Sequence, residues 1–375
     1  MNPNDIRYGC LSGHAGSYGD FSTFDTLSEA IVARFGSLRD TFTGRFLNVT
    51  SEWREQGIHE WLFHQVIWKP LTGRIWWNGG VNPDSTAQSA SLPLEPLDIP
   101  RLLQASRKST ANALGETKSG TAVEIGSGES SEDDWEKMEH SKLSRSPVTQ
   151  DSPALDMLFT WFGQSTCLVQ MENITLLTDP VFGNKPMDTI LAPSRLRPPA
   201  CSLQELLILD IVDIVLISHN HFDHLDVEVV RTLQDRVTWV VPLALKGFFL
   251  KAGVSENKVI EMDWWEERRI MVASGSITVA CTPAQHWSGR TPWAANQTLW
   301  CGFIVKGTRT EKSFYHCGDT GYSQELFQGI GKRYGPITLA ALPIGSYNPR
   351  WIMSTVHTDP EGAVKIHRDL RVEKS

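Results

Sequence analysis

The stretch that decides the fold of this chain is Ser218-His219-Asn220-His221-Phe222-Asp223-His224-Leu225-Asp226. It places three histidines and one aspartate within six residues, directly after the apolar run 211–217, which we predict to be a buried strand. His219 and His221 are two residues apart, so in extended backbone their imidazoles point to the same side. Because imidazole and carboxylate groups are ligands of zinc in proteins, the motif predicts a metal site.

The second half of the motif points to a second metal ion. Asp223 and His224 follow at the expected turn into a helix, from which they can face another point a few ångströms away. That arrangement suits two metals. The alternative is a degenerate site that has the same spacing and binds no metal.

Composition is typical of a soluble globular protein. The 375 residues suffice for one large α/β domain with extensions or for two domains. Hydrophobic residues make up 41% and charged residues 21%. The net charge of −8 argues against a nucleic-acid partner, because proteins that bind phosphate backbones are usually basic. The six cysteines are scattered without a C-x-x-C pair, which indicates reduced, mostly buried thiols in an intracellular protein.

No targeting or membrane-spanning segment is expected. The N-terminal residues contain neither the basic region nor the apolar core of a signal peptide. The longest apolar run, 206–217, is interrupted by Asp210 and Asp213 and falls short of the roughly 18 residues that a spanning helix needs. The chain can still lie on a membrane, and its fourteen tryptophans fit a membrane interface as well as they fit core packing.

Composition changes along the chain and predicts four segments. Residues 1–40 are weakly patterned and are expected to be disordered. Residues 41–83 are rich in aromatic side chains and are expected to pack on the main domain, with one amphipathic helix over 61–68. Residues 84–150 are rich in Ser, Thr, Glu, Lys and Gly and are expected to be a disordered insert, because they cannot bury enough apolar surface. Residues 151–375 form the folded domain.

Within that domain, short apolar runs alternate with turns and helical stretches. The predicted strands cover 158–162, 167–171, 174–178, 215–217, 239–241, 277–281, 302–305 and 339–343. The predicted helices cover 227–233, 243–251 and 360–370, the last with Asp359 as its N-cap and Pro360 in its first turn.

Two later segments place polar residues at expected strand ends. The segment 282–287 contains His286, and the segment 316–321 contains Asp319. Either residue alone is more often an ordinary turn residue, but together with the first motif they complete a hypothesis for two metals. One ion would be held by His219, His221 and His286, the other by Asp223 and His224, and Asp319 would bridge them.

The order of these motifs resembles the metallo-β-lactamase superfamily, and more narrowly the family of N-acyl-phosphatidylethanolamine-hydrolysing phospholipases D. The resemblance covers about residues 155–375, with a short further similarity at 44–48. The segments that carry it are Thr178-Asp179-Pro180-Val181-Phe182, 216–226, Asp263-Trp264-Trp265-Glu266-Glu267, Gln285-His286-Trp287, Gly318-Asp319-Thr320-Gly321-Tyr322, 331–336 and 343–351. The H-x-H-x-D-H motif is typical of the whole superfamily, whereas the tryptophan-bearing segments are typical of the family.

The resemblance implies an α/β fold, the four-layer αββα sandwich, with two zinc ions at one edge. It implies hydrolysis of N-acyl-phosphatidylethanolamine to N-acylethanolamine and phosphatidic acid, with Asp223 and Asp319 as candidate catalytic residues and His357 as a candidate substrate-binding residue. The partners would be the phospholipid and the surface of its membrane, and a homodimer is a further candidate. The expected location is intracellular and peripheral to a membrane, cytoplasmic or mitochondrial.

Three departures from the family pattern keep alternatives open. The family has a further metal-binding histidine in a strand after the helix that matches 360–370, and this chain is expected to end at Ser375 before that strand, as a domain that lacks its C-terminal end. The second site would then lack a ligand unless His316 or water replaces it. A family histidine is Gln164 here, and the insert is unusually long. The alternatives are another hydrolase of this fold, such as a lactonase or a different phosphodiesterase, and a degenerate, non-catalytic binding protein.

Overall fold

The computed structural model describes residues 157–185, 195 and 197–375, with short N-terminal stretches at 39, 43–48, 50, 98–99 and 101–102. Almost all of the segments 1–40, 41–83 and 84–150, including the helix predicted over 61–68, lies outside the described residues. Leu102 is an exception within the segment 84–150: its side chain is buried, and its carbonyl accepts a hydrogen bond from Gln170 Nε2 at 2.9 Å. The folded domain therefore includes part of the chain around Leu102.

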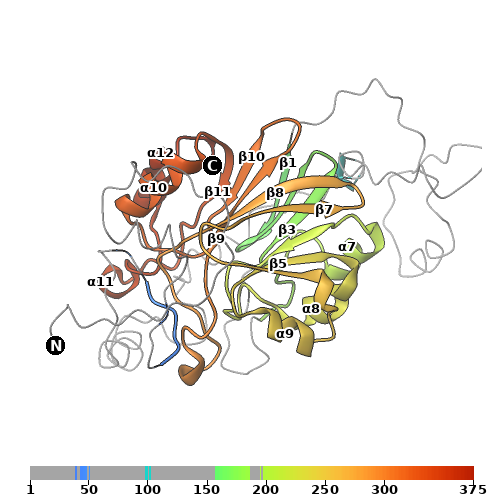
Figure 1. Cartoon of the computed structure of the whole chain (residues 1–375), viewed down its shortest axis with the longest axis horizontal. Coiled ribbons are helices and arrows are strands. Elements are labelled where there is room, and N and C mark those ends of the chain that lie inside the picture. The colour runs from blue at the N-terminus through green and yellow to red at the C-terminus, as the bar shows by residue number, and fades with distance from the viewer. Residues whose placement is uncertain are drawn as a thin grey trace, which may run out of the picture. The chain divides into compact units, whose positions relative to one another are not determined.

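The first sheet consists of six strands that lie in the order of the sequence (Figure 1). They are β1 (Leu158–Gly163), β2 (Thr166–Met171), β3 (Ile174–Thr178), β4 (Ile214–Leu216), β5 (Thr238–Pro242) and β6 (Val259–Met262). β1 to β3 pair antiparallel, and β3 to β6 pair parallel. The parallel strands are connected through the helices α7 (Leu203–Leu209), α8 (Val227–Leu233) and α9 (Lys246–Lys251), together with the short 3-10 helices η3 (Gln234–Arg236) and η4 (Glu256–Lys258).

The second sheet also has six strands, in the order β12-β11-β10-β9-β8-β7. They are β7 (Glu267–Val272), β8 (Gly275–Thr282), β9 (Gly302–Gly307), β10 (Ser313–His316), β11 (Ile337–Ala341) and β12 (Val372–Lys374). β7 to β10 pair antiparallel, and β10, β11 and β12 pair parallel. The remaining helices are η5 (Pro292–Ala294), α10 (Gln324–Tyr334), α11 (Arg350–Met353) and α12 (Pro360–Asp369).

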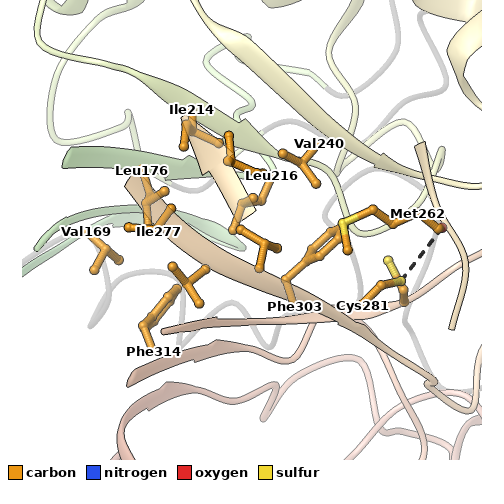
Figure 2. Packing of buried hydrophobic residues seen from close by; sticks show 14 of the residues in the cluster. Val169, Leu176, Ile214, Leu216, Val240, Met262, Ile277, Cys281, Phe303 and Phe314 are labelled. Carbon is orange, nitrogen blue, oxygen red and sulfur yellow. Dashed lines mark hydrogen bonds between the residues drawn. The ribbon is translucent and has the colours of Figure 1, made fainter. Parts of the chain in front are cut away.

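The core between the two sheets follows from the two-residue period of their strands. Ile214 and Leu216 of β4 face the second sheet, where they belong to one buried cluster with Phe303 of β9 and Phe314 of β10 (Figure 2). The alternate residue Val215 belongs to a different cluster on the outer face.

Helices cover the outer face of each sheet. Buried side chains of α7, α8 and α9 share a cluster with the outward residues of the first sheet. α10 and α12 cover the second sheet (Figure 1). Buried residues of these helices, such as Phe327 and Ile366, share a cluster with the outward residues of that sheet. The order helix, sheet, sheet, helix confirms the predicted αββα sandwich.

Local signals explain where several elements begin and end. Asp359 caps α12 by accepting a hydrogen bond from Gly362 N at 2.8 Å, with Pro360 in the first turn, as predicted. α7 begins at a capping box of Ser202 and Glu205, a signal that the sequence analysis did not use. The apolar run 206–217 therefore divides between the end of α7 and the strand β4.

The strand after the last helix differs from the expectation. It was expected only beyond Ser375, but β12 starts at Val372, and it pairs parallel with β11. Within the described residues no helix is long and apolar enough to cross a bilayer. The five cysteines of the described part, Cys167, Cys201, Cys281, Cys301 and Cys317, are all buried and free, as predicted for thiols.

Candidate metal centre

The predicted ligands meet because three strands end near one point. His219, His221, Asp223 and His224 follow β4 of the first sheet. His286 follows β8 and Asp319 follows β10, both in the second sheet. The two sheets are joined there by the backbone, because Cys301 N donates to Ser218 O at 2.9 Å. The site thus lies at the edge where the strand ends of both sheets come together.

The first group of candidate ligands is His219, His221 and His286, and one ring nitrogen from each lies within 4.8 Å of the others. His221 Nδ1 is 2.8 Å from His219 Nε2 and 3.3 Å from His286 Nε2. Burial and the neighbouring histidines lower the pKa of His219 and His221 well below the usual value. Burial likewise lowers the pKa of His286 to about 3. Neutral imidazole is the form that binds a metal ion.

The second group is His219, His224 and Asp319. Asp319 Oδ2 lies 3.1 Å from His224 Nε2, 3.9 Å from His286 Nε2 and 3.7 Å from His357 Nδ1. Asp319 therefore lies close to members of both groups, where the sequence hypothesis places a bridge. Burial lowers the pKa of His224, but the carboxylates of Asp319 and Asp223 and the hydrogen bond to Asp179 together raise it well above the usual value. The pocket around His224 thus favours positive charge.

Asp223 lies at the rim of this second group. Its Oδ2 is 4.0 Å from His224 Nε2, and its side chain is 44% exposed. Gln164 Nε2 donates to Asp223 Oδ2 at 2.7 Å and to the Asp223 carbonyl at 3.2 Å. Gln164, which stands where the family has a histidine, therefore holds this carboxylate by its side chain.

One buried carboxylate sets the orientation of two ligand rings, and the sequence analysis assigned it no role. Asp179, directly after β3, accepts hydrogen bonds from Ser218 N at 2.7 Å, from Ser218 Oγ at 2.7 Å and from His224 Nδ1 at 2.8 Å. Ser218 Oγ gives its proton to Asp179, so it accepts from His219 Nδ1 at 2.9 Å. His219 and His224 consequently both turn Nε2 toward the site.

The loop that carries His286 is fixed on both sides. His286 Nδ1 donates to the carbonyl of Val356 at 2.9 Å, which leaves Nε2 free to face the other ligands. On the other side, Asn48 Nδ2 donates to the carbonyl of His286 at 2.8 Å, and Thr50 Oγ1 donates to Gln285 Oε1 at 2.6 Å. The short N-terminal stretch thus holds the loop, a role for which the sequence carries no signal beyond the similarity at 44–48.

His357 lies at the entrance to the centre. Its ring centroid is 5.3 Å from that of His286, and its side chain is 15% exposed. It lines a small cavity of about 30 Å³ with Tyr322, Tyr347, Arg350, Ser354, Thr358 and Asp359. Trp287, which is partly exposed, packs edge-on against His221 with ring centroids 4.2 Å apart. A substrate that reaches the ligand cluster would therefore meet His357 and Trp287.

His316 is not placed as a substitute ligand. Its Nε2 lies 2.8 Å from Asp179 Oδ2 rather than among the atoms of either ligand group. The suggestion that His316 serves as a further ligand of the second group is therefore wrong for this arrangement. The physical reason is that His316 ends β10 on the buried side, where the carboxylate of Asp179 is the acceptor within reach.

The donor atoms of the site fit a borderline cation such as zinc. The ring nitrogens of His219, His221 and His286 converge, and the carboxylate of Asp319 lies beside them. His221 Nε2 is buried and has no hydrogen-bond partner among the described residues, whereas its Nδ1 faces the cluster. Three imidazole nitrogens with a carboxylate beside them form a donor set that zinc takes in proteins.

Comparisons with known proteins agree with this geometry. The family described as the β-lactamase superfamily domain matches residues 175–375, more than half of the chain. The N-acyl-phosphatidylethanolamine-hydrolyzing phospholipase D 1 of Caenorhabditis elegans is 39% identical over 58% of this chain and 61% of its own length. The mitochondrial N-acyl-phosphatidylethanolamine-hydrolyzing phospholipase D of Saccharomyces cerevisiae is 30% identical over 87% of this chain and 65% of its own length. The chain thus spans less than two thirds of either relative.

A metallo hydrolase from the archaeon Ignicoccus hospitalis is a solved structure that aligns with 57% of this chain and 78% of its own, at 24% identity and a TM-score of 0.44. The family match, the αββα layers and the histidine and aspartate cluster lead to the same assignment. The chain belongs to the metallo-β-lactamase superfamily, with homologues among the N-acyl-phosphatidylethanolamine-hydrolysing phospholipases D.

Proposed function

We propose that the protein is a metal-dependent hydrolase with two zinc ions, which cleaves N-acyl-phosphatidylethanolamine to N-acylethanolamine and phosphatidic acid. The observation that carries the proposal is the pair of adjacent ligand groups that share His219 and meet at Asp319. The names of the two homologues support the substrate class.

The residues take distinct roles in this proposal. His219, His221 and His286 would hold one ion, Asp223 and His224 would hold the other, and Asp319 would serve both. When bound, two zinc ions would acidify a water molecule and neutralise the charge that develops on a phosphodiester. Among these ligands, Asp223 and Asp319 are also the candidate catalytic residues.

The protein itself positions the substrate around the ions. His357, 3.7 Å from Asp319 at the entrance, is placed to donate a hydrogen bond to a phosphodiester oxygen. Trp287 supplies an apolar wall beside His221, suited to the lipid part of the substrate. Holding the diester between these groups lowers the entropic part of the barrier.

The test combines metal analysis with product analysis on one sample. The purified chain is equilibrated with zinc, freed of unbound metal, and analysed for zinc per chain and for N-acylethanolamine released from N-acyl-phosphatidylethanolamine in mixed micelles. We expect two ions and release of both products, loss of release on chelation and recovery with added zinc. Phosphatidylethanolamine without the N-acyl group serves as the matched control lipid.

Two other outcomes would favour the alternatives. A chain with two ions that ignores the N-acyl lipid but opens lactones or cleaves other diesters is a different hydrolase of the same fold. A chain that retains none or one ion and hydrolyses nothing is a degenerate binding protein.

We propose further that the chain works as a peripheral protein on an intracellular membrane and that it forms a homodimer. A phospholipid substrate and the name of the mitochondrial yeast relative support the first part. Flotation with phosphatidylcholine vesicles that contain the N-acyl lipid tests membrane binding, and light scattering of the eluting protein tests the dimer. A monomer that stays with the unbound fraction would contradict both.

A further inference from the structure

A buried histidine outside the ligand groups joins the two halves of the metal centre. His316 ends β10 of the second sheet, three residues before Asp319, and only 3% of its side chain is exposed. Its Nε2 lies 2.8 Å from Oδ2 of Asp179, which follows β3 of the first sheet. The contact therefore links the loop of Asp319 to the carboxylate that orients His224 and, through Ser218, His219.

The chemistry of the groups determines which atom donates in each hydrogen bond of this network. Asp179 is fully buried, and its carboxylate accepts from Ser218 N through Oδ1 and from the Ser218 hydroxyl through Oδ2. His316 Nε2 and His224 Nδ1 must then both carry protons. Oδ2 of Asp179 serves His316, His224 and the Ser218 hydroxyl, all within 2.7 to 2.8 Å.

The other ring nitrogen of His316 lacks a hydrogen bond among the described residues, which lowers the stability of the fold. His316 Nδ1 is buried and finds no hydrogen-bond partner in the part of the chain that the structure describes. Leaving a buried polar atom unpaired costs about 1–3 kcal/mol. An apolar residue at this position would avoid that cost, so packing alone does not account for a histidine here.

We propose that His316 is a positioning residue for the second metal site. By holding Asp179 from the side of the second sheet, it fixes the orientation of the His224 ring and the separation between His224 and Asp319, now 3.1 Å. It acts through Asp179 and contacts neither metal nor substrate. The inference rests on the proposed two-metal function, because it concerns the affinity of the site that contains His224 and Asp319.

The test measures zinc affinity without any substrate. His316→Leu removes the donor with little change of volume, and His316→Gln keeps an N–H that can reach Asp179. In zinc titrations against a competing chelator, His316→Leu should bind the second ion about 10–100-fold more weakly while the first ion keeps its affinity. His316→Gln should recover much of the loss. His367→Leu, on the exposed side of α12 where His367 Nδ1 lies 3.0 Å from Ser375 Oγ, is the matched control.

Two results would overturn the inference. In one, His316→Leu binds both ions as the wild type does. In the other, it loses both ions equally together with the metal-free thermal stability, which would make His316 merely structural. Failure of the proposed function looks different, because the wild type would then bind two ions and leave N-acyl-phosphatidylethanolamine intact, while the titrations of the His316 variants would still separate the two sites.

Discussion

A buried acidic residue lies near each end of strand β3, and the two residues have different hydrogen-bond partners. Glu172 precedes the strand and Asp179 follows it, and both are buried acids with positive φ, 50° and 36°. Each reaches across to the second sheet. Glu172 meets the turn before β10, with residues Thr308 to Thr310, and Asp179 meets His316 at the end of β10.

Glu172 and Asp179 differ in the groups that donate hydrogen bonds to them. Glu172 accepts from the backbone N–H groups of Thr308, Arg309 and Thr310 at 2.6 to 3.1 Å and from the Thr310 hydroxyl at 2.8 Å. Backbone amides have one protonation state, so this end can only hold the sheets together. Asp179 accepts from two imidazoles and a serine, and its contacts with His224 and Ser218 determine which nitrogen of His224 and of His219 faces the metal centre. One carboxylate is therefore structural, and the other orients ligands.

The largest expected effect is that of Asp179→Asn. The amide would turn an N–H toward donors that have no other acceptor, and His224 and His219 would lose their fixed proton positions. Breaking a buried charged network of this kind costs about 3–5 kcal/mol. Zinc affinity should fall by roughly 100-fold or more, the upper end for loss of a partner behind a ligand. Denaturant unfolding and zinc titration of the same protein measure the two losses.

A variant Asp179→Asn that is destabilised but binds zinc normally would contradict the proposed role. The two ends of β3 would then be equivalent, and the orientation of His219 and His224 would have to come from the ligands themselves.

Glu172→Gln should lower the free energy of unfolding without changing the zinc content. Replacing the carboxylate weakens several hydrogen bonds to a charged acceptor, and the expected loss is about 2–3 kcal/mol. Zinc content should stay at the wild-type value. Urea unfolding beside metal analysis gives both readings, and a lowered zinc content would mean that the far end of β3 is coupled to the site.

The same variant changes the pH dependence of stability. Burial raises the pKa of Glu172, but the hydrogen bonds from Thr310, Arg309 and Thr308 together lower it below its ordinary 4.5. The unfolded chain then binds more protons, so this stabilisation is present above about pH 4.5 and is lost as the pH falls through the lower folded pKa. Between pH 6 and pH 3 the wild type should therefore lose more stability than Glu172→Gln, and parallel curves would argue against a shifted carboxylate.

The sequence predicted the fold where residue type and period agree. The strand 174–178 is observed with these bounds, and so is the helix 227–233. The strand is a short apolar run that is buried at every position, and the helix buries Val229, Val230 and Leu233 at helical spacing. β7 was missed because Glu267, Arg268 and Arg269 are exposed and give it no apolar signal. α10 was missed although Ser323 caps it, since glycines interrupt its helical pattern.

The candidate site could be predicted where its metal ligands lie in local sequence motifs. The cluster of His219 to His224 is visible in six consecutive residues, and His286 and Asp319 follow predicted strands. Asp179 contacts Ser218 and His224, 39 and 45 positions away, and His316, 137 positions away, while Asn48 reaches His286 across 238 positions. No local pattern contains such pairs, so they required the packed sheets.

Gln164→Ala is expected to have a moderate effect confined to the second site. Gln164 is exposed and makes a 2.7 Å hydrogen bond to Asp223 Oδ2, so its loss frees that carboxylate without opening the core. Affinity for the second zinc ion should fall about 10-fold, while stability changes by less than about 0.5 kcal/mol. Gln328→Ala is the matched control, because the Gln328 amide in α10 donates to Asp369 Oδ1 of α12 at 3.3 Å, outside the metal centre. An unchanged second affinity would show that Asp223 is held without Gln164.

The smallest effect should come from Thr310→Val. The substitution keeps the branched shape and the backbone N–H but removes the hydroxyl that donates to Glu172 Oε1 at 2.8 Å. We expect a loss of about 1 kcal/mol, the typical contribution of one hydrogen bond. Thr310→Ser, which keeps the hydroxyl, should stay within about 0.5 kcal/mol of the wild type. Both variants should bind two zinc ions with wild-type affinity, because nothing at this end of β3 sets a proton on a ligand. If Thr310→Val weakened zinc binding, strand β3 would transmit strain from one buried acid to the other, and the separation of structural and ligand-orienting ends would be wrong.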